Sequence, residues 1–469
     1  MLKKASRELL NSIPDYKDFP TLEELDESSK KLAEQYPDIA SIKEVGRSRE
    51  NRPLLCLKIG SGSKNALVFG LPHPNEPIGF MLMEHLSWEL ARNKELRDEL
   101  DYTWYFLKAW DADGYKLNEG WIKGPFTITN YMRHFYRPAG FEQVDWTFPI
   151  SYKEKHFDKP LPETVVMMKL IDDIKPRFIY SLHNAGIGGT YWYMSEPTPE
   201  IFEELHAVPK KEKIPIHLGE PESPLVPVYY PAIYGALGVK GAYDALEKMG
   251  RNMKEFASEH KAGDNSASYA KEKYNTFTLL TELPYFYDPR IDDQSEADMI
   301  RRDAVIQKTE ENHKLSLELI EIMKVSEEHF SPDNHFYLAC KNFSEIRPDY
   351  MERALMIMEG KEEYNRKATV AEKFDNLLGS KFYQAITFAM IVRANESELE
   401  LMKKAGEDNP AKKAALEKGL EKAMAGYKKI TDFLEAEMNY KVIPIKSLVA
   451  IQLECGLIVA DYLHKHPDL

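Results

Sequence analysis

The sequence predicts an α/β fold, in which helices cover both faces of a β-sheet, followed by an all-helical C-terminal domain. Up to about residue 290, short apolar runs bounded by turn residues alternate with helical segments of about ten or more residues, a pattern typical of α/β proteins. Beyond about residue 293, strand-like runs nearly vanish and the chain becomes rich in alanine, lysine, glutamate and leucine.

The predicted strands share an apolar, β-branched or aromatic core between turn signals. In chain order they are RPLLCLKIG (52–60), NALVFGL (65–71), DYTWYFLKAW (101–110), RFIYSLH (177–183) and NTFTLLTELP (275–284). The clearest helical patterns between them are LEELDESSKKLAEQY (22–36), IGFMLMEHLSWELARN (78–93) and VVMMKLIDDI (165–174). Pro77 stands at the start of the second helix, where a proline needs no N–H group.

The length of 469 residues indicates two domains, because a single core usually stops growing at about 250–300 residues. Residues 295–329 carry one long helical pattern, which is followed by the turn-rich segment HFSPDNH (329–335). We therefore place the predicted boundary there, with an α/β domain of residues 1–328 and a helical domain of residues 329–469.

Charge and cysteine content narrow the function classes. The net charge of −14 argues against nucleic acid or anionic membrane as a partner, since both need a basic surface. The three cysteines, Cys56, Cys340 and Cys455, are widely separated and favour buried thiols in a reducing compartment. Neither a signal-peptide core nor an apolar run near ~18 residues is found, so we expect a cytoplasmic protein without a membrane span.

The segment GLPHPNEPIGF (70–80) places His73 and Glu76 directly after an apolar strand and before a helix. Active sites of open α/β sheets lie at the carboxyl ends of strands. Imidazole nitrogen and carboxylate oxygen both suit Zn²⁺, and the two flanking prolines restrict the loop. Taken alone, the same motif is more often a capping glutamate beside a polar loop histidine.

Two further strand ends strengthen the metal hypothesis. His183 follows the apolar run RFIYSL, and Glu282 lies near the end of TFTLLTELP. Two histidines and one glutamate form an established ligand set for catalytic zinc, which leaves one position open. The remaining carboxylate is then available as a general base.

Six segments stand in an informative order: YPDIASIKEVGRSRENRPLLCLKIG (36–60), HPNE (73–76), DADGY (111–115), MRHFYRP (132–138), SLHN (181–184) and TFTLLTELP (276–284). In order and spacing they resemble the zinc carboxypeptidases of the carboxypeptidase A type. The corresponding family features are a GxSxExRP turn, the HxxE zinc motif, an NPDGY turn, a WRKNR segment, the third zinc ligand and the catalytic glutamate. The resemblance spans roughly residues 35–290.

The resemblance implies a mixed twisted sheet with helices on both faces, and a zinc-dependent hydrolase acting on peptide or amide bonds. It implies that His73, Glu76 and His183 hold one Zn²⁺ per chain and that Glu282 is the catalytic base. Arg133 would then stabilise the negatively charged oxygen of the transition state, with an effect of about 3–4 kcal/mol.

The resemblance also implies that Asp145, in VDWTFP, orients the first zinc histidine through a hydrogen bond. At this point the family normally has VDxNRNF, whose Asn-Arg pair grips the terminal carboxylate of the substrate. That pair has no counterpart here. Arg137 is a candidate for carboxylate binding, but it is equally a surface residue.

The family's active-site tyrosine has no clear match either. The expected place falls near ASEHKAGDNSASY, which offers His260 and Tyr269. Tyr229, Tyr230 and Tyr234, in VPVYYPAIYG, are further candidates.

Three functions stay open from sequence. The first is a metallopeptidase that removes a residue from a short peptide, and the second is a zinc amide hydrolase or deacylase acting on a small acylated molecule. The missing Asn-Arg pair favours the second. The third is a catalytically silent binding module, against which the retention of all three ligands argues. The helical C-terminal domain is a candidate cover for the active site or a candidate interface for a homo-oligomer.

Overall fold

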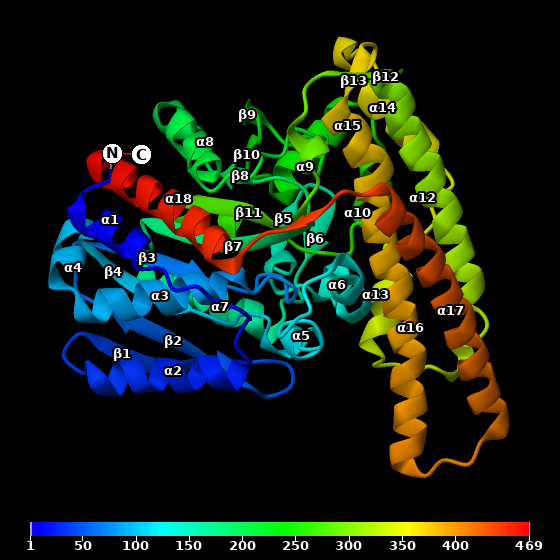
Figure 1. Ribbon diagram of the computed structural model, residues 1–469, viewed down its shortest axis with the longest axis horizontal. Helices are drawn as coiled ribbons and strands as arrows, with labels where there is room; N and C mark the ends of the chain where they lie inside the picture. The colour runs from blue at the N-terminus through cyan, green and yellow to red at the C-terminus, as the bar shows by residue number, and fades with distance from the viewer. Residues whose placement is uncertain (1, 469) are drawn as a thin grey trace.

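The structure is a computed structural model that describes residues 2–468. Its centre is a ten-stranded mixed sheet with the order β1-β2-β4-β3-β7-β11-β8-β10-β9, and β14 pairs with β11 off this path (Figure 1). These strands are β1 (Ala40–Arg47), β2 (Pro53–Ile59), β3 (Lys64–Phe69), β4 (Tyr102–Leu107), β7 (Phe178–Ile187), β8 (Tyr191–Met194), β9 (Val228–Tyr230), β10 (Ile233–Gly235), β11 (Phe277–Tyr287) and β14 (Lys441–Val442). Two small sheets pair β5 (Ile150–Tyr152) with β6 (Lys155–Phe157), and β12 (Glu296–Ile300) with β13 (Lys367–Thr369).

The centre of the sheet is parallel. β4, β3, β7 and β11 are neighbours that run in the same direction, whereas β1, β2 and β8 join by antiparallel pairing. All ten residues of β7 are buried, which fits a strand that is covered on both faces. The predicted mixed α/β sheet is thus confirmed. The parallel arrangement brings the carboxyl ends of β3, β7 and β11 to one edge.

Helices cover both faces of this sheet. One face carries α3 and α18, and the other carries α7 (Figure 1). α11 packs beside α7 against β11. The helices that precede the C-terminal helical region are α1 (Lys4–Asn11), α2 (Leu22–Gln35), α3 (Ile78–Arg92), α4 (Lys94–Leu100), α5 (Ala112–Lys116), α6 (Ile128–His134), α7 (Pro162–Ile174), α8 (Phe202–Lys211), α9 (Val239–Lys248), α10 (Met253–Glu259) and α11 (Ser266–Tyr274).

The turn between β3 and α3 is held tightly against the sheet. Pro77 is the N-cap residue of α3, and the first turn of the helix packs directly on β7. A Cβ atom on Gly79 would lie 2.7 Å from Cβ of Leu182, so only glycine permits this approach. The close packing fixes the position of the loop that precedes α3.

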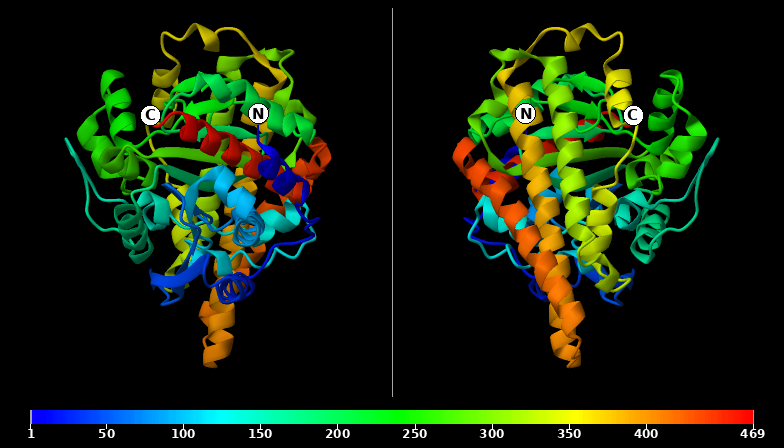
Figure 2. Two further views of the ribbon diagram at one scale, coloured as in Figure 1. Left: turned by 90° about the vertical axis from the view of Figure 1, so that its left-hand side faces the viewer. Right: turned by 90° about the vertical axis from the view of Figure 1, so that its right-hand side faces the viewer.

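The C-terminal half builds a separate layer of helices beside the sheet (Figures 1 and 2). Its helices are α12 (Arg301–Met323), α13 (His335–Phe343), α14 (Tyr350–Met358), α15 (Val370–Phe374), α16 (Ser380–Ala405) and α17 (Pro410–Glu437). The long helices α16 and α17 pack side by side, and the tip of this hairpin projects beyond the rest of the molecule (Figure 2). The predicted helical C-terminal region is therefore confirmed, although it is not all-helical, since it also contains the short strands β13 and β14.

Two helices pack across the predicted boundary at residue 328. α12 packs against α14, α16 and α17, so it belongs to the helical layer. The last helix, α18 (Ile445–Lys465), returns to the sheet, where the Tyr102 hydroxyl donates to the carbonyl of Ala460 at 3.1 Å. Within residues 2–468, no helix, α18 included, is long and apolar enough to cross a lipid bilayer.

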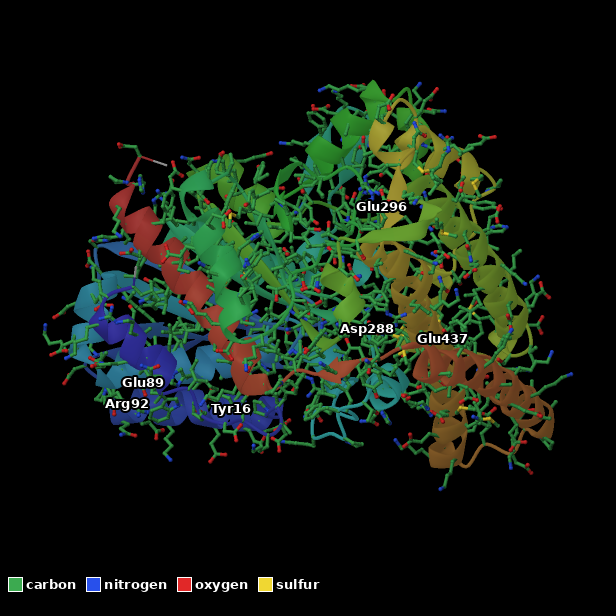
Figure 3. The ribbon with its side chains drawn as sticks, turned by 45° about the horizontal axis from the view of Figure 1, so that its top comes forward. Tyr16, Glu89, Arg92, Asp288, Glu296 and Glu437 are labelled. Atoms are coloured by element: carbon green, nitrogen blue, oxygen red, sulfur yellow. The ribbon has the colours of Figure 1, made fainter. Side chains whose placement is uncertain are left out.

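Residues that follow β11 fasten the helical layer to the sheet. Asp288 accepts a hydrogen bond from the backbone N–H of Asn439 at 2.8 Å. Arg290 pairs with Asp288 at 2.7 Å and donates to the carbonyl of Glu437 at the end of α17, at 2.9 Å (Figure 3 labels Asp288 and Glu437). The strand that carries Glu282 is thus joined to the helix that ends the layer.

Candidate metal centre

His73 and Glu76 lie in the short loop between β3 and α3. Both side chains are buried, and the backbone N–H of Glu76 donates to the carbonyl of His73 at 3.2 Å. This turn directs both side chains to the same point. Nδ1 of His73 lies 2.9 Å from Oε1 of Glu76.

His183 and Glu282 come from the two neighbouring parallel strands β7 and β11. They are direct partners in the register of this pair, and both are buried. Nδ1 of His183 lies 3.1 Å from Oε2 of Glu76 and 3.4 Å from Oε1 of Glu282. The parallel strands therefore bring all four predicted residues together.

His73, Glu76 and His183 form a group suited to one metal ion. One ligand atom from each lies within 4.8 Å of the others. Nδ1 of His183 and Oε2 of Glu76 are buried without a hydrogen-bond partner among the described residues, although the two atoms are 3.1 Å apart. Buried polar atoms without partners are costly, and a bound cation would satisfy both. Two imidazoles and a carboxylate are a ligand set of catalytic zinc, so the residues fit this metal.

The charge states also suit metal binding. Burial, reinforced by the nearby Arg137, lowers the pKa of His73 to about 3, which keeps its imidazole neutral. Burial opposes ionisation of Glu76, but favourable electrostatic interactions with the neighbouring imidazoles, first of His73 and then of His183, hold the pKa of Glu76 below its usual range. Neutral imidazole and ionised carboxylate are the forms that bind a metal.

Ser181 fixes the orientation of His183. Its Oγ lies 2.8 Å from Nε2 of His183, and a proton on Nε2 that is donated to Ser181 leaves the lone pair on Nδ1. On the other side of the strand pair, Nε2 of Gln452 in α18 donates to the carbonyl of His183 at 3.2 Å. The returning C-terminal helix thus supports the strand that carries this ligand.

Glu282 has the environment of a general base that must pick up a proton. Burial, followed by the negative charges of Glu76 and Glu222, raises its pKa well above the usual value. A carboxylate with a raised pKa binds a proton more readily. Its position beside the histidine–glutamate group places that proton next to the metal site.

Of the two predicted arginines, the structure places Arg137 beside the metal site and Arg133 away from it. Nη1 of Arg137 lies 3.6 Å from Oε1 of Glu76. Its Nε donates to Gln143 at 3.0 Å, and its guanidinium lies over the Trp146 ring at 5.2 Å. Arg133 is not among the described residues that line the cavity at the metal site, and it pairs instead with Glu396 at 2.6 Å.

The helix α6, which carries Arg133, explains this difference. Arg133 lies in its last turn and faces α16, whereas the chain turns into an extended conformation at Phe135. Arg393 of α16 donates to the carbonyls of His134 and Phe135 at 2.8 and 3.0 Å. These bonds hold the segment that presents Arg137 to the site.

Asp145 lies at the same cavity but does not make the expected hydrogen bond. Its Oδ1 accepts from the backbone N–H of Ser266 at 2.8 Å, at the start of α11. Nε2 of His73 has no hydrogen-bond partner among the described residues. Burial raises the pKa of Asp145 to about 6. Asp145 is therefore tied to α11 rather than to the first histidine.

The metal site opens into a cavity of about 760 Å³. Glu76, His183, Glu282, Arg137 and Asp145 all contribute to its lining. Five carboxylates line it, whereas Arg137 is its single lysine or arginine among the described residues. The space is large enough for a small-molecule or short-peptide ligand.

Helices of the C-terminal layer form part of the cavity wall. The contributing residues come from α13 and α16 and are Phe343, Tyr383, Gln384, Ile386, Thr387 and Met390. Sequence patterns missed them because α16 is a long helix with apolar residues on most sides, which looks like any core helix. The layer thus restricts the space above the metal site.

The candidate replacements for the family's tyrosine differ in whether they line a cavity at the metal site. His260 lines the main cavity, and Tyr234 lines a smaller cavity that adjoins it. Tyr229, Tyr230 and Tyr269 are not among the described residues that line either cavity. Tyr193 and Tyr383 do line the main cavity, and no sequence signal singled them out.

Comparisons with known proteins identify zinc carboxypeptidases as similar to this chain. A model of the zinc carboxypeptidase family matches residues 25–315, more than half of the chain. The chain is similar to carboxypeptidase D of Anas platyrhynchos, with 23% identity over 223 residues, 43% of this chain and 16% of that protein. It is also similar to zinc carboxypeptidase A 1 of Anopheles gambiae, with 30% identity over 128 residues, 24% of this chain and 29% of that protein.

The matched segments thus span less than a third of the length of either curated relative. A metallo-carboxypeptidase structure from Burkholderia cenocepacia aligns with a TM-score of 0.35 and 16% identity, over 56% of this chain and 60% of that one.

Proposed function

Because the chain belongs to the zinc carboxypeptidase family, we propose that it is a zinc-dependent hydrolase that cleaves a peptide or amide bond. The observation that carries this proposal is the convergence of His73, Glu76 and His183, with Glu282 as their neighbour, at one end of a large cavity. One zinc ion per chain would be held by the first three residues. When bound, zinc polarises the scissile carbonyl and lowers the pKa of a water molecule.

Glu282 moves the proton in the proposed reaction. Its carboxylate takes a proton from the attacking water and delivers it to the leaving nitrogen. The pKa of Glu282 is raised by burial and by the negative charges of Glu76 and Glu222. The raised pKa helps Glu282 to hold the proton between the two steps.

Arg137 rather than Arg133 is proposed to stabilise the developing negative charge on the carbonyl oxygen. The guanidinium of Arg137 is next to the metal ligands and is held in place by Gln143 and Trp146. A preorganised donor of this kind lowers the barrier by about 3–4 kcal/mol.

The charges of the cavity favour an amide hydrolase or deacylase over a carboxypeptidase. With Arg137 assigned to the carbonyl oxygen, the described lining offers no second arginine or lysine for a terminal carboxylate. The carboxylate of Glu222, which is neither a metal ligand nor the proposed base, would repel such a group. A neutral or positively charged substrate meets no such obstacle.

A matched substrate pair tests this choice. An N-acylated dipeptide with a free C-terminal carboxylate and the corresponding carboxamide differ in one charge. We expect kcat/KM of the carboxamide to equal or exceed that of the acid. A preference for the acid by about a hundredfold or more would restore the carboxypeptidase hypothesis, because it equals about 2.7 kcal/mol of carboxylate recognition. Zinc binding without turnover of any acylated peptide would favour the silent module.

A further inference from the structure

A second cavity of about 280 Å³ adjoins the main one. Both are lined by Ala185, Glu222, Tyr383 and Gln384, so these residues stand at the junction. The side cavity also contacts the π-helical turn Asp375–Gly379, which precedes α16. Single π-helical turns are frequent at functional sites. A ligand in the main cavity can therefore extend a group into the side cavity.

Glu222 is the carboxylate at this junction, and it has no basic partner among residues 2–468. Its two oxygens accept hydrogen bonds from the hydroxyls of Tyr191 and Tyr193, at 2.7 and 3.1 Å. These bonds orient the carboxylate without neutralising its charge. The Tyr191 and Tyr193 side chains are buried, whereas Glu222 itself is exposed at the cavity.

The other two carboxylates of the side cavity do have basic neighbours. Glu220 pairs with Arg301 at 2.5 Å. Asp375 lies 3.4 Å from Nε2 of His217, and Lys308 lies close enough to lower the pKa of Asp375 further. Glu222 is thus the one carboxylate of the side cavity without a basic partner among the described residues.

Aromatic rings lie around the carboxylate of Glu222. Tyr191, Tyr234 and Tyr383 line the side cavity, and Tyr193 lies 5.5 Å from Tyr234 between ring centroids. An ionised carboxylate beside several aromatic rings is the chemistry that recognises an ammonium or guanidinium group, through an ion pair and cation–π contacts.

We propose that Glu222 and the surrounding tyrosines bind a positively charged group of the substrate, an ammonium or a guanidinium, at the junction of the two cavities. That the bound cation belongs to a substrate rests on the proposed function of the chain as a hydrolase. The binding of the cation itself does not, because the Glu222 carboxylate would attract a cation whether or not the chain hydrolyses an amide bond.

The test uses pairs of blocked peptides that carry either lysine or norleucine at the same position, so that the two members of a pair differ only in charge. One pair has this residue on the N-terminal side of the amide bond to be cleaved, and a second pair has it on the C-terminal side. Their dissociation constants are measured by calorimetry on the metal-free full chain, so that no turnover occurs. We expect the best lysine peptide to bind about tenfold or more tightly than its norleucine partner, in keeping with a hydrogen bond to a charged group.

Glu222→Gln keeps an acceptor for the tyrosines and removes the charge. It should abolish the preference for lysine and leave norleucine binding unchanged. The matched control Glu34→Gln, at an exposed position of α2, should keep the preference. Equal or undetectable binding of the two peptides by the wild type, or an unchanged preference in Glu222→Gln, would overturn the proposal. If the zinc-loaded protein still preferred the lysine peptide but hydrolysed neither peptide, the proposed function would be wrong and the cation site would stand.

Discussion

Replacing Glu282 by glutamine is expected to lower kcat by about 10²–10⁴-fold, the range typical of a lost general base. Glutamine has nearly the same shape, but its amide cannot take a proton from the attacking water. Glu282 is not one of the three proposed ligands, so the zinc content should stay at the wild-type level. Steady-state kinetics and metal analysis on the same preparation check both expectations.

The control for this variant is Glu34→Gln, which removes the same charge from an exposed helix position and should leave kcat unchanged. If Glu282→Gln kept the wild-type rate, the assignment of the base would be wrong. If it lost both rate and zinc, Glu282 would be a ligand rather than a base.

Arg137→Met is expected to lower kcat by about 10²–10³-fold, as for the loss of one donor to the oxyanion. The guanidinium lies 3.6 Å from Glu76 at the metal site, and no other lysine or arginine lines the cavity among the described residues. Arg133→Met is the matched comparison. It removes an ion pair with the partly exposed Glu396, and such pairs contribute about 0–1 kcal/mol, so kcat should change little.

The pair of arginine variants therefore separates the two assignments by steady-state kinetics. A larger loss of kcat in Arg133→Met than in Arg137→Met would return the oxyanion role to Arg133, as the sequence resemblance implied. Thermal unfolding of both variants checks that neither result reflects a loss of the fold.

The central strands were predictable because each is a buried parallel strand with an apolar, β-branched or aromatic core. The runs 65–71, 177–183 and 275–284 correspond to β3, β7 and β11. The sequence placed His183 and Glu282 at strand ends, but β7 and β11 continue past them to Ile187 and Tyr287. The two residues meet because these strands pair in parallel, and His73 joins them from the loop after β3, the other neighbour of β7.

The environment of the site was not predictable from the same patterns. Arg133 and Arg137 lie four residues apart in one segment, and only the end of α6 at His134 decides which of them faces the metal ligands. Tyr383 and Glu222 reach the cavity from α16 and from a loop, both remote from any recognisable motif. The contribution of Tyr383 depends on how the helical layer docks, and that of Glu222 on hydrogen bonds from Tyr191 and Tyr193, which local sequence does not encode.

The first and last helices of the C-terminal region also show that local sequence predicts a helix but not the element it packs against. The apolar pattern of α18 predicts a buried helix but not its partner, and in the structure that partner is the sheet. α12 has a helical pattern that continues directly from the α/β part, yet it packs with the later helices. A change of composition therefore located helices correctly without locating the division between layers.

The most direct test of the central claim is zinc binding by the metal-free full chain, measured by titration and by elemental analysis after gel filtration. The wild type is predicted to bind one zinc per chain and to regain activity with it, whereas His73→Ala, Glu76→Ala and His183→Ala should each lose tight binding. Equal zinc content in all four proteins, or full activity after exhaustive chelation, would contradict the account.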